Sequence, residues 1–380
     1  MPRHPKKALA FAITALAALL VACGDIANPE GWATPHFTND TLYYFPDDDT
    51  LVAVTFDDDQ PQTVTWGFPD TAIDAEANLD IDAVYGDVVV DDDVIYFAGW
   101  EGHVYAVDRD SGRLLWTTRD RLDVEGSIVA GLLHHNNTLY FGTTEGFFYA
   151  LEDETGAPAP GWRADGIEFP KGLWATPLLL DETIYLATMT GEVHAISAED
   201  GSPVWDAPFE SGTGAIPELS LLNDELLFVP TLGKTVYLLD AATGQEEFPS
   251  FDTEDWVWTS PAFDGNYAYF GDFEGVIHAL DITTGHDAWT AQAEDKVKAA
   301  PAIVDDVVVF ADRGPVVHFF DRETGDRIGV PNHAIDSGTV RADLVARDGY
   351  AYILTTSGDL WRADPETATV QPVPMPGAAE

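Results

Sequence analysis

The sequence predicts an all-β fold, a single eight-bladed β-propeller of four-stranded antiparallel blades. A pattern of short apolar runs separated by Gly, Asn and Asp turns repeats through most of the chain, with a period of about 40 to 45 residues. No stretch after the N-terminal segment shows sustained helical periodicity. With 46% hydrophobic and 12% aromatic residues, the chain is rich enough in apolar side chains to form a folded core.

The N-terminal segment is typical of a secretion signal. Residues 1–22 carry three basic side chains and no acidic one, and the apolar run over 8–22 is too short to span a bilayer. The segment ends in Leu-Val-Ala followed by Cys23 and Gly24, which resembles the bacterial lipobox. That resemblance implies cleavage before Cys23 and attachment of lipid to its thiol. We therefore expect a signal peptide at 1–22 and a lipidated N-terminus with a short linker at 23–30.

The charge of the chain is strongly acidic. Without residues 1–22, it has 15 Lys and Arg against 66 Asp and Glu, a net charge of about −51. Such a chain repels phosphate backbones, so nucleic acid is excluded as a partner. The same charge favours solubility and destabilises the compact state by self-repulsion. Only four lysines remain in the mature chain: Lys171, Lys234, Lys296 and Lys298.

The repeat places one central residue in the third strand of each blade. These residues are Ala53, Ala106, Ala150, Ala195, Leu238, Ala279, Phe319 and Arg362. The steps between them are 53, 44, 45, 43, 41, 40 and 43 residues. Eight copies of this length, each with four short strands, match propeller blades. We expect the propeller to occupy 31–374 and a tail to occupy 375–380.

One copy of the repeat, over 275–281, has Gly, alternating apolar residues, Ala and Asp, and it is followed by Thr284, Gly285 and Trp289. With these residues, the repeat resembles the PQQ-type propeller repeat. Gly supplies turns with positive φ, and the indole should pack between blades. The tryptophan recurs at Trp116 and Trp205, is shifted at Trp162, and is replaced by Phe248 and Ile328 in two copies.

A lipobox followed by a short linker and eight such blades is similar to the outer-membrane protein assembly factor B family. This resemblance implies a protein-binding scaffold whose partners belong to the β-barrel assembly machinery. It also implies a monomer without a cofactor, anchored by lipid on the extracytoplasmic side of the cell envelope. In a cell with two membranes, the anchor would lie in the outer one.

The alternatives are a quinoprotein (PQQ-dependent) dehydrogenase-like enzyme and a small-ligand-binding propeller. Quinoprotein dehydrogenases are similar in their blades, but they enclose the quinone with long insertions and commonly a vicinal disulfide. Here Cys23 is the only cysteine, and steps near 43 residues leave no room for inserted domains. We therefore expect no enzymatic activity and no catalytic residues.

Three histidines occupy equivalent positions in three blades, at His194, His278 and His318. Other blades place Val52, Tyr105, Tyr149, Tyr237 and Trp361 there, so the position is predicted to hold a packed ring. Ligands of one metal ion must converge within a few ångströms, which residues spread around a propeller do not. We expect no metal site. His134 and His135 precede an Asn-Asn turn and are predicted to be exposed, and the Asp runs at 47–49, 57–59 and 91–93 are predicted to be solvated turns.

Aromatic and basic residues gather before the first strand of several blades, near the predicted central channel. In several copies of the repeat, the first apolar run begins with a proline. The residues three positions before this proline, or before its equivalent, are Trp32, Trp174, Gly214, Trp258 and Lys298. Together with neighbouring cations, the candidate partner-binding rim comprises Trp32, Lys171, Trp174, Trp258, Lys296, Lys298 and Arg341. Exposed aromatic and cationic side chains are favoured in binding sites. The other interpretation is that the indoles pack the channel mouth while the cations relieve acidic repulsion.

The first step of 53 residues exceeds the next by nine. The extra sequence lies between Phe56 and Tyr85, is acidic, and has a poor strand signal. We expect a protruding loop there, and loops often carry recognition.

Overall fold

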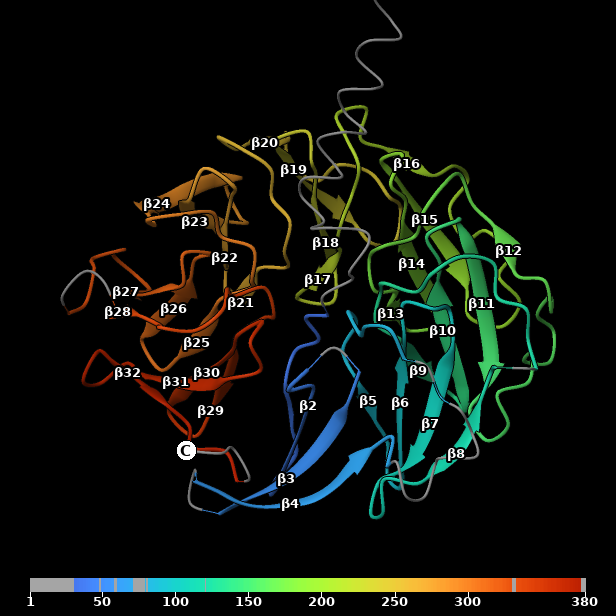
Figure 1. The fold of residues 1–380 in the computed structure, drawn as a ribbon. Helices are drawn as coiled ribbons and strands as arrows, with labels where there is room; N and C mark the ends of the chain where they lie inside the picture. Colours follow the sequence, from blue (N-terminus) through green and yellow to red (C-terminus); the bar gives the residue numbers. More distant parts are fainter. Residues whose placement is uncertain are drawn as a thin grey trace, which may run out of the picture.

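A computed structural model describes residues 31–376 except 48, 58, 59, 71–78, 80, 120 and 330–332. Its strands form eight four-stranded antiparallel sheets arranged as blades around a central axis (Figure 1). The predicted all-β, eight-bladed propeller is therefore confirmed. The predicted signal peptide and the lipid attachment at Cys23 lie outside the described residues. Among those residues, no helix has the length and apolar character needed to cross a membrane.

The first four blades use the first sixteen strands in order. Blade 1 comprises β1 (His36–Phe37), β2 (Thr41–Tyr44), β3 (Leu51–Asp57) and β4 (Gln60–Phe68). Blade 2 comprises β5 (Val89–Val90), β6 (Val94–Ala98), β7 (Val104–Asp108) and β8 (Leu114–Thr117). Blade 3 comprises β9 (Leu133–His135), β10 (Thr138–Gly142), β11 (Phe147–Glu152) and β12 (Ile167–Glu168). Blade 4 comprises β13 (Leu178–Leu180), β14 (Thr183–Ala187), β15 (Glu192–Ser197) and β16 (Phe209–Glu210).

The remaining blades continue in the same order. Blade 5 comprises β17 (Ser220–Leu222), β18 (Leu226–Pro230), β19 (Thr235–Asp240) and β20 (Phe251–Asp252). Blade 6 comprises β21 (Ala262–Asp264), β22 (Tyr267–Gly271), β23 (Val276–Asp281) and β24 (His286–Gln292). Blade 7 comprises β25 (Ala302–Val304), β26 (Val307–Ala311), β27 (Val316–Asp321) and β28 (His333–Ala334). Blade 8 comprises β29 (Val345–Arg347), β30 (Tyr350–Leu354), β31 (Leu360–Asp364) and β32 (Thr369–Pro372).

The second and third strands of each blade form the buried core. All eight second strands, for example β14 and β26, are buried along all but their first residue, because neighbouring blades cover both faces. The outer strand β24 instead alternates between exposed and half-buried residues, as expected for a sheet edge with one covered face. All eight predicted central residues, from Ala53 to Arg362, lie in the third strand of their blade.

Tryptophans in or shortly before the outer strand dock blades 1, 2, 4 and 6 onto the blade that follows. The Trp205 indole Nε1 donates a hydrogen bond to the Ala241 carbonyl of blade 5, at 3.1 Å. The ring lies on Gly244, which has a φ of 72°. A Cβ at that glycine would approach the indole to 2.7 Å, so no larger residue fits. The same pairing recurs as Trp66 with Gly112, Trp116 with Gly156, and Trp289 with Gly325. The prediction that the indoles pack between blades is confirmed.

The ring closes by side-chain packing between blade 8 and blade 1, because each blade is built from four consecutive strands. These two blades lie next to each other in Figure 1, in red and blue. Arg347 of blade 8 donates hydrogen bonds to the carbonyls of Thr38 and Asn39, at 3.0 and 2.8 Å. Its guanidinium also covers the Phe37 ring at 4.8 Å. Apolar residues of both blades share one core cluster beneath this contact.

The segment between Phe56 and Tyr85 is not a loop throughout, so that prediction was wrong in its first part. Residues Gln60–Phe68 form β4, the outer strand of blade 1. The strand signal was missed because an outer edge strand carries mostly polar residues, which read as loop. Trp66 lies in this strand and docks blade 1 on blade 2, with its Nε1 donating to the Arg109 carbonyl at 2.9 Å.

Candidate functional site

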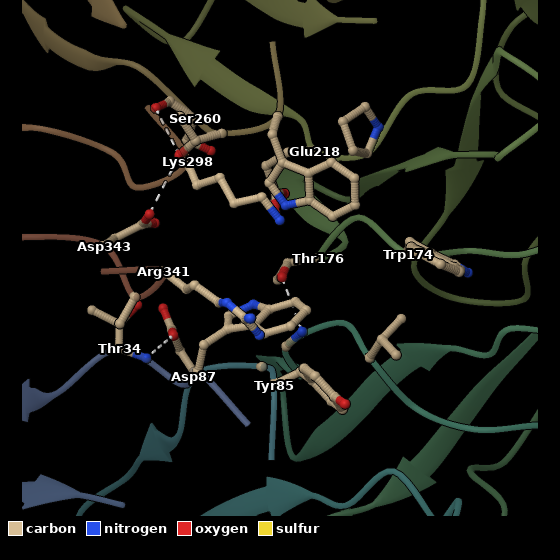
Figure 2. Close-up of a pocket in the computed structure, with 18 residues that line it drawn as sticks. Thr34, Tyr85, Asp87, Trp174, Thr176, Glu218, Ser260, Lys298, Arg341 and Asp343 are labelled. Atoms are coloured by element: carbon tan, nitrogen blue, oxygen red, sulfur yellow. Dashed lines mark hydrogen bonds between the residues drawn. The ribbon is translucent and has the colours of Figure 1, made fainter. Parts of the chain in front are cut away.

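One cavity lies on the propeller axis. The segments that precede the innermost strands all reach it, so every blade contributes to its wall. We call this cavity, of about 100 Å³, the channel pocket (Figure 2). Its lining residues are Trp32, Thr34, Tyr85, Gly86, Asp87, Val129, Gly131, Trp174, Thr176, Pro217, Glu218, Trp258, Thr259, Ser260, Lys298, Arg341, Ala342 and Asp343.

Aromatic and cationic side chains share one layer of the channel pocket. Lys298 Nζ lies 5.0 Å from the centre of the Trp258 ring, and the Arg341 guanidinium lies 5.7 Å from that of Trp32. Trp174 and Trp258 meet edge to face, with ring centres 6.5 Å apart. These cation–π contacts hold the positive charges against the ring faces. The layer is half-buried rather than fully exposed.

Carboxylates form a second layer, which the sequence analysis missed. They are Asp87, Glu218 and Asp343, and Figure 2 shows them among the side chains around the cavity. Asp87 accepts a hydrogen bond from the backbone N–H of Thr34 at 2.9 Å. Asp343 accepts one from the backbone N–H of Ala300 at 2.6 Å. Each acid stands two residues before the first strand of its blade, a repeat position that could have been found in the sequence.

The pKa values of these three carboxyls are raised. Burial raises the pKa of Glu218 to about 8, and the negative charges of Asp343 and Asp87 add to the rise. Burial, followed by the charge of Asp87, raises the pKa of Asp343 to about 6. Water reaches Asp87 through the channel, but protein surrounds its other sides, and this burial raises its pKa as well. The channel pocket therefore changes charge with pH.

Five of the seven predicted rim residues line this one cavity: Trp32, Trp174, Trp258, Lys298 and Arg341. Lys296 lies beside it, with Nζ 5.3 Å from the centre of the Phe273 ring, which stacks on Trp258. Lys171 is exposed and does not contribute to the lining. The indoles of the lining are half-buried, which lies between the two interpretations of the sequence, exposed binding residues and packing of the channel mouth.

The strand register corrects the reading of blade 5. Ser220 pairs with Phe228 as Leu178 pairs with Tyr185 in blade 4, so the position equivalent to Trp174 is Ile216. The sequence analysis chose Gly214 for this position because it lies three residues before Pro217. That choice is two residues away from the true equivalent, Ile216. Ile216 is fully buried and takes no part in the lining.

The three equivalent histidines lie apart, each with its own partner. His194 Nε2 lies 2.9 Å from a Glu192 carboxylate oxygen, and His318 Nε2 lies 2.9 Å from one of Asp312. His278 Nδ1 lies 3.1 Å from an Asp287 oxygen. Burial alone would lower the pKa of His278 most strongly, but the neighbouring carboxylates of Asp272 and Asp287 raise it above its usual value.

His134 and His135 were predicted to be exposed, and the structure corrects this. Their side chains are 19% and 22% exposed. Both lie in the inner strand β9 rather than in the turn that follows it, so blade 2 and blade 4 neighbours cover them.

The lining chemistry of the channel pocket suits binding. It offers hydroxyls from Thr34, Thr176, Thr259 and Ser260, and it contains no histidine or cysteine among the described lining residues. Its aromatic faces, cations and carboxylates provide contacts of the kinds that dominate protein recognition.

The chain matches a family model described as outer membrane protein assembly factor BamB over residues 59–171 and 159–371. It is 26% identical over 321 residues to the Vibrio cholerae protein of that name, covering 70% of this chain and 81% of the relative. It is 25% identical over 231 residues to the Shewanella oneidensis protein of that name, covering 58% of this chain and 56% of the relative.

Among solved structures, the crystal structure of BamB from Moraxella catarrhalis has a TM-score of 0.67 and 17% sequence identity. The match covers 86% of this chain and 95% of that one. At this identity the likeness concerns the fold. The family model matches most of the propeller, and the chain therefore belongs to the outer membrane protein assembly factor BamB family.

Proposed function

We propose that the protein is a lipid-anchored, non-enzymatic scaffold in outer-membrane protein assembly, and that a protein partner binds at the channel pocket. The support for the role is the family match over 59–371, together with the names of the relatives. Cys23 is the proposed lipid attachment site, on the extracytoplasmic side of the cell envelope, with the anchor in the outer membrane where the cell has two membranes. The propeller works as a monomer without a cofactor.

The observation that carries the binding site is the gathering of indoles and cations at one cavity. A chain with 66 acidic residues and four mature lysines directs Lys298 and Arg341 to the same opening, over the Trp258 and Trp32 rings. Half-buried indoles beside cations offer a partner large contact areas and charged anchors. The partner that fits is a protein segment with apolar and acidic side chains.

The test for the role is co-isolation. The lipidated protein is crosslinked in membranes of a cell with a β-barrel assembly machinery, and the associated proteins are identified. Recovery of barrel-assembly proteins supports the scaffold. Their absence from the crosslinked material, with the propeller intact, contradicts it.

The test for the site uses Trp174→Ala and Lys298→Glu, singly and together. The pair should weaken partner binding by several kcal/mol, on the order expected when central anchors are lost. Thermal melting is measured in parallel, with the exposed Lys171→Glu as a control. If melting drops while the affinity per folded molecule stays constant, the residues pack the channel and the partner binds elsewhere.

A further inference from the structure

Asp91, His134 and Asp153 form a cluster at the junction of blades 2 and 3, away from the channel pocket. Each offers one ligand atom, and these atoms all lie within 4.8 Å of one another. His134 Nε2 lies 2.8 Å from an Asp153 carboxylate oxygen. Asp91 belongs to blade 2, whereas the other two residues belong to blade 3.

His134 departs from the repeat. His134 pairs with Leu139, the second residue of the second strand of blade 3. In every other blade, one residue of the first strand pairs with the second strand at the same position. All seven of those residues are apolar: Phe37, Val90, Leu179, Leu221, Phe263, Ile303 and Ala346. An imidazole in this position makes less apolar contact with the neighbouring blade than the apolar side chains of the other blades do. Blade 3 alone has this substitution among the described blades.

Asp153 departs from the repeat in the same blade. It stands three residues after the central residue of the third strand, where four blades have the buried apolar residues Phe56, Ala198, Ala241 and Ile282. The Asp153 side chain is only 6% exposed. A buried carboxylate is costly unless a partner compensates its charge. No other blade has an acid at this position.

The junction of blades 6 and 7 is a matched comparison. Asp264 occupies the Asp91 position there, Arg322 occupies the Asp153 position, and the two form an ion pair at 2.6 Å. At the junction of blades 2 and 3, the arginine is replaced by a second carboxylate. The same place in the fold therefore holds two acids and an imidazole where its equivalent holds an acid and a fixed cation. A bound cation would compensate the negative charges of the two carboxylates.

We propose that Asp91, His134 and Asp153 bind a divalent transition-metal ion, Zn²⁺, that joins blades 2 and 3. An imidazole nitrogen and carboxylate oxygens are ligands that Zn²⁺ uses at about 2.0–2.2 Å. Tetrahedral ligands at that range lie about 3.4 Å apart, so small rotations of Asp91 and of the His134–Asp153 pair are sufficient. Water completes the fourth position on the exposed side, where Asp91 lies. Hard Ca²⁺ prefers all-oxygen sites with more ligands and competes poorly here.

The test measures Zn²⁺ uptake by the full chain in equilibrium dialysis. Chelator-treated protein is dialysed against Zn²⁺ with excess Ca²⁺, which occupies the acidic surface. The key variant is His134→Leu with Asp153→Ala, because these are residues that other blades use at the same positions and the blade should therefore fold. His194→Leu, which removes another half-buried histidine paired with a carboxylate, is the matched control.

We expect one Zn²⁺ per chain to be lost from the double variant and retained by the control. Zn²⁺ should raise the melting temperature of the wild type and not that of the double variant. Asp91→Asn, at an exposed position, should weaken uptake by at least about tenfold without lowering the metal-free melting temperature. Equal uptake by the wild type and the double variant, or no saturable uptake by the wild type, overturns the proposal.

Discussion

The carboxyl of Glu218, in the wall of the channel pocket, makes stability depend on pH between about pH 4.5 and pH 8. Its pKa is about 8 in the folded chain and 4.5 for a free glutamate. The folded state therefore holds a proton that the unfolded state releases between these values, and stability falls as pH rises through this window. Replacing Glu218 with Gln removes this dependence, because the amide is neutral at every pH.

The size of the effect follows from the two pKa values. Between about pH 6 and pH 8.5, the penalty for Glu218 grows by about 2.5 kcal/mol if the full shift applies. The side chain is partly open to the channel, and water there reduces the gain to about 1–2.5 kcal/mol. The free energy of unfolding of Glu218→Gln, relative to that of the wild type, should therefore rise by this amount between about pH 6 and pH 8.5.

The assay is urea unfolding at several pH values in constant high salt, followed by tryptophan fluorescence. Glu199→Gln, at an exposed carboxyl, is the control and should run parallel to the wild type. Histidines such as His278 are present in all three proteins, so the difference between curves reports Glu218 together with its electrostatic coupling to Asp343. If the Glu218→Gln and wild-type curves stay parallel from pH 6 to pH 8.5, Glu218 is ionised in the folded channel and the reasoning fails.

Three further predictions concern the anchor, the charge and the blade docking. Cys23→Ser should leave the protein unprocessed or soluble, and unchanged partitioning into detergent would contradict lipidation at this residue. Raising salt from 0.1 M to 1 M shortens the Debye length from about 10 Å to about 3 Å, so the melting temperature should rise; a flat response would show that the acids are already compensated. Trp205→Ala should lower the free energy of unfolding by about 3–5 kcal/mol, whereas Trp205→Phe, which loses mainly the hydrogen bond to Ala241, should cost about 1–3 kcal/mol. Equal losses for the two variants in urea unfolding would show that ring packing contributes nothing beyond the hydrogen bond.

The fold could be predicted from the repeat because every blade has the same packing requirements. Two buried strands need apolar runs, the turns need Gly with positive φ, and the indole needs a partner blade, so all three signals recur every 40 to 45 residues. Where a blade departs from the repeat pattern, the prediction from sequence failed. The outer strand β4 carries polar residues on an exposed edge, and its sequence does not differ from that of a loop.

The candidate site was predictable only in part. Trp32, Trp174, Trp258, Lys298 and Arg341 could be grouped from the sequence because they share one repeat position or its neighbourhood. The carboxylates of Asp87, Glu218 and Asp343 share a position too, but in a chain with 66 acids they do not stand out. Only the closing of the ring brings residues more than a hundred positions apart to one axis, where burial raises their pKa values.

The sequence by itself determined the class of fold, the number of blades, and the strong acidity, since these depend on local periodicity and composition. The tertiary structure decided which side chains meet across blades. Asp91 lies in an acidic turn of blade 2, and His134 and Asp153 are separated by a hairpin of blade 3, so no spacing in the chain marks them as a group. Their proximity arises from the way adjacent blades pack face to face, which local sequence patterns do not encode.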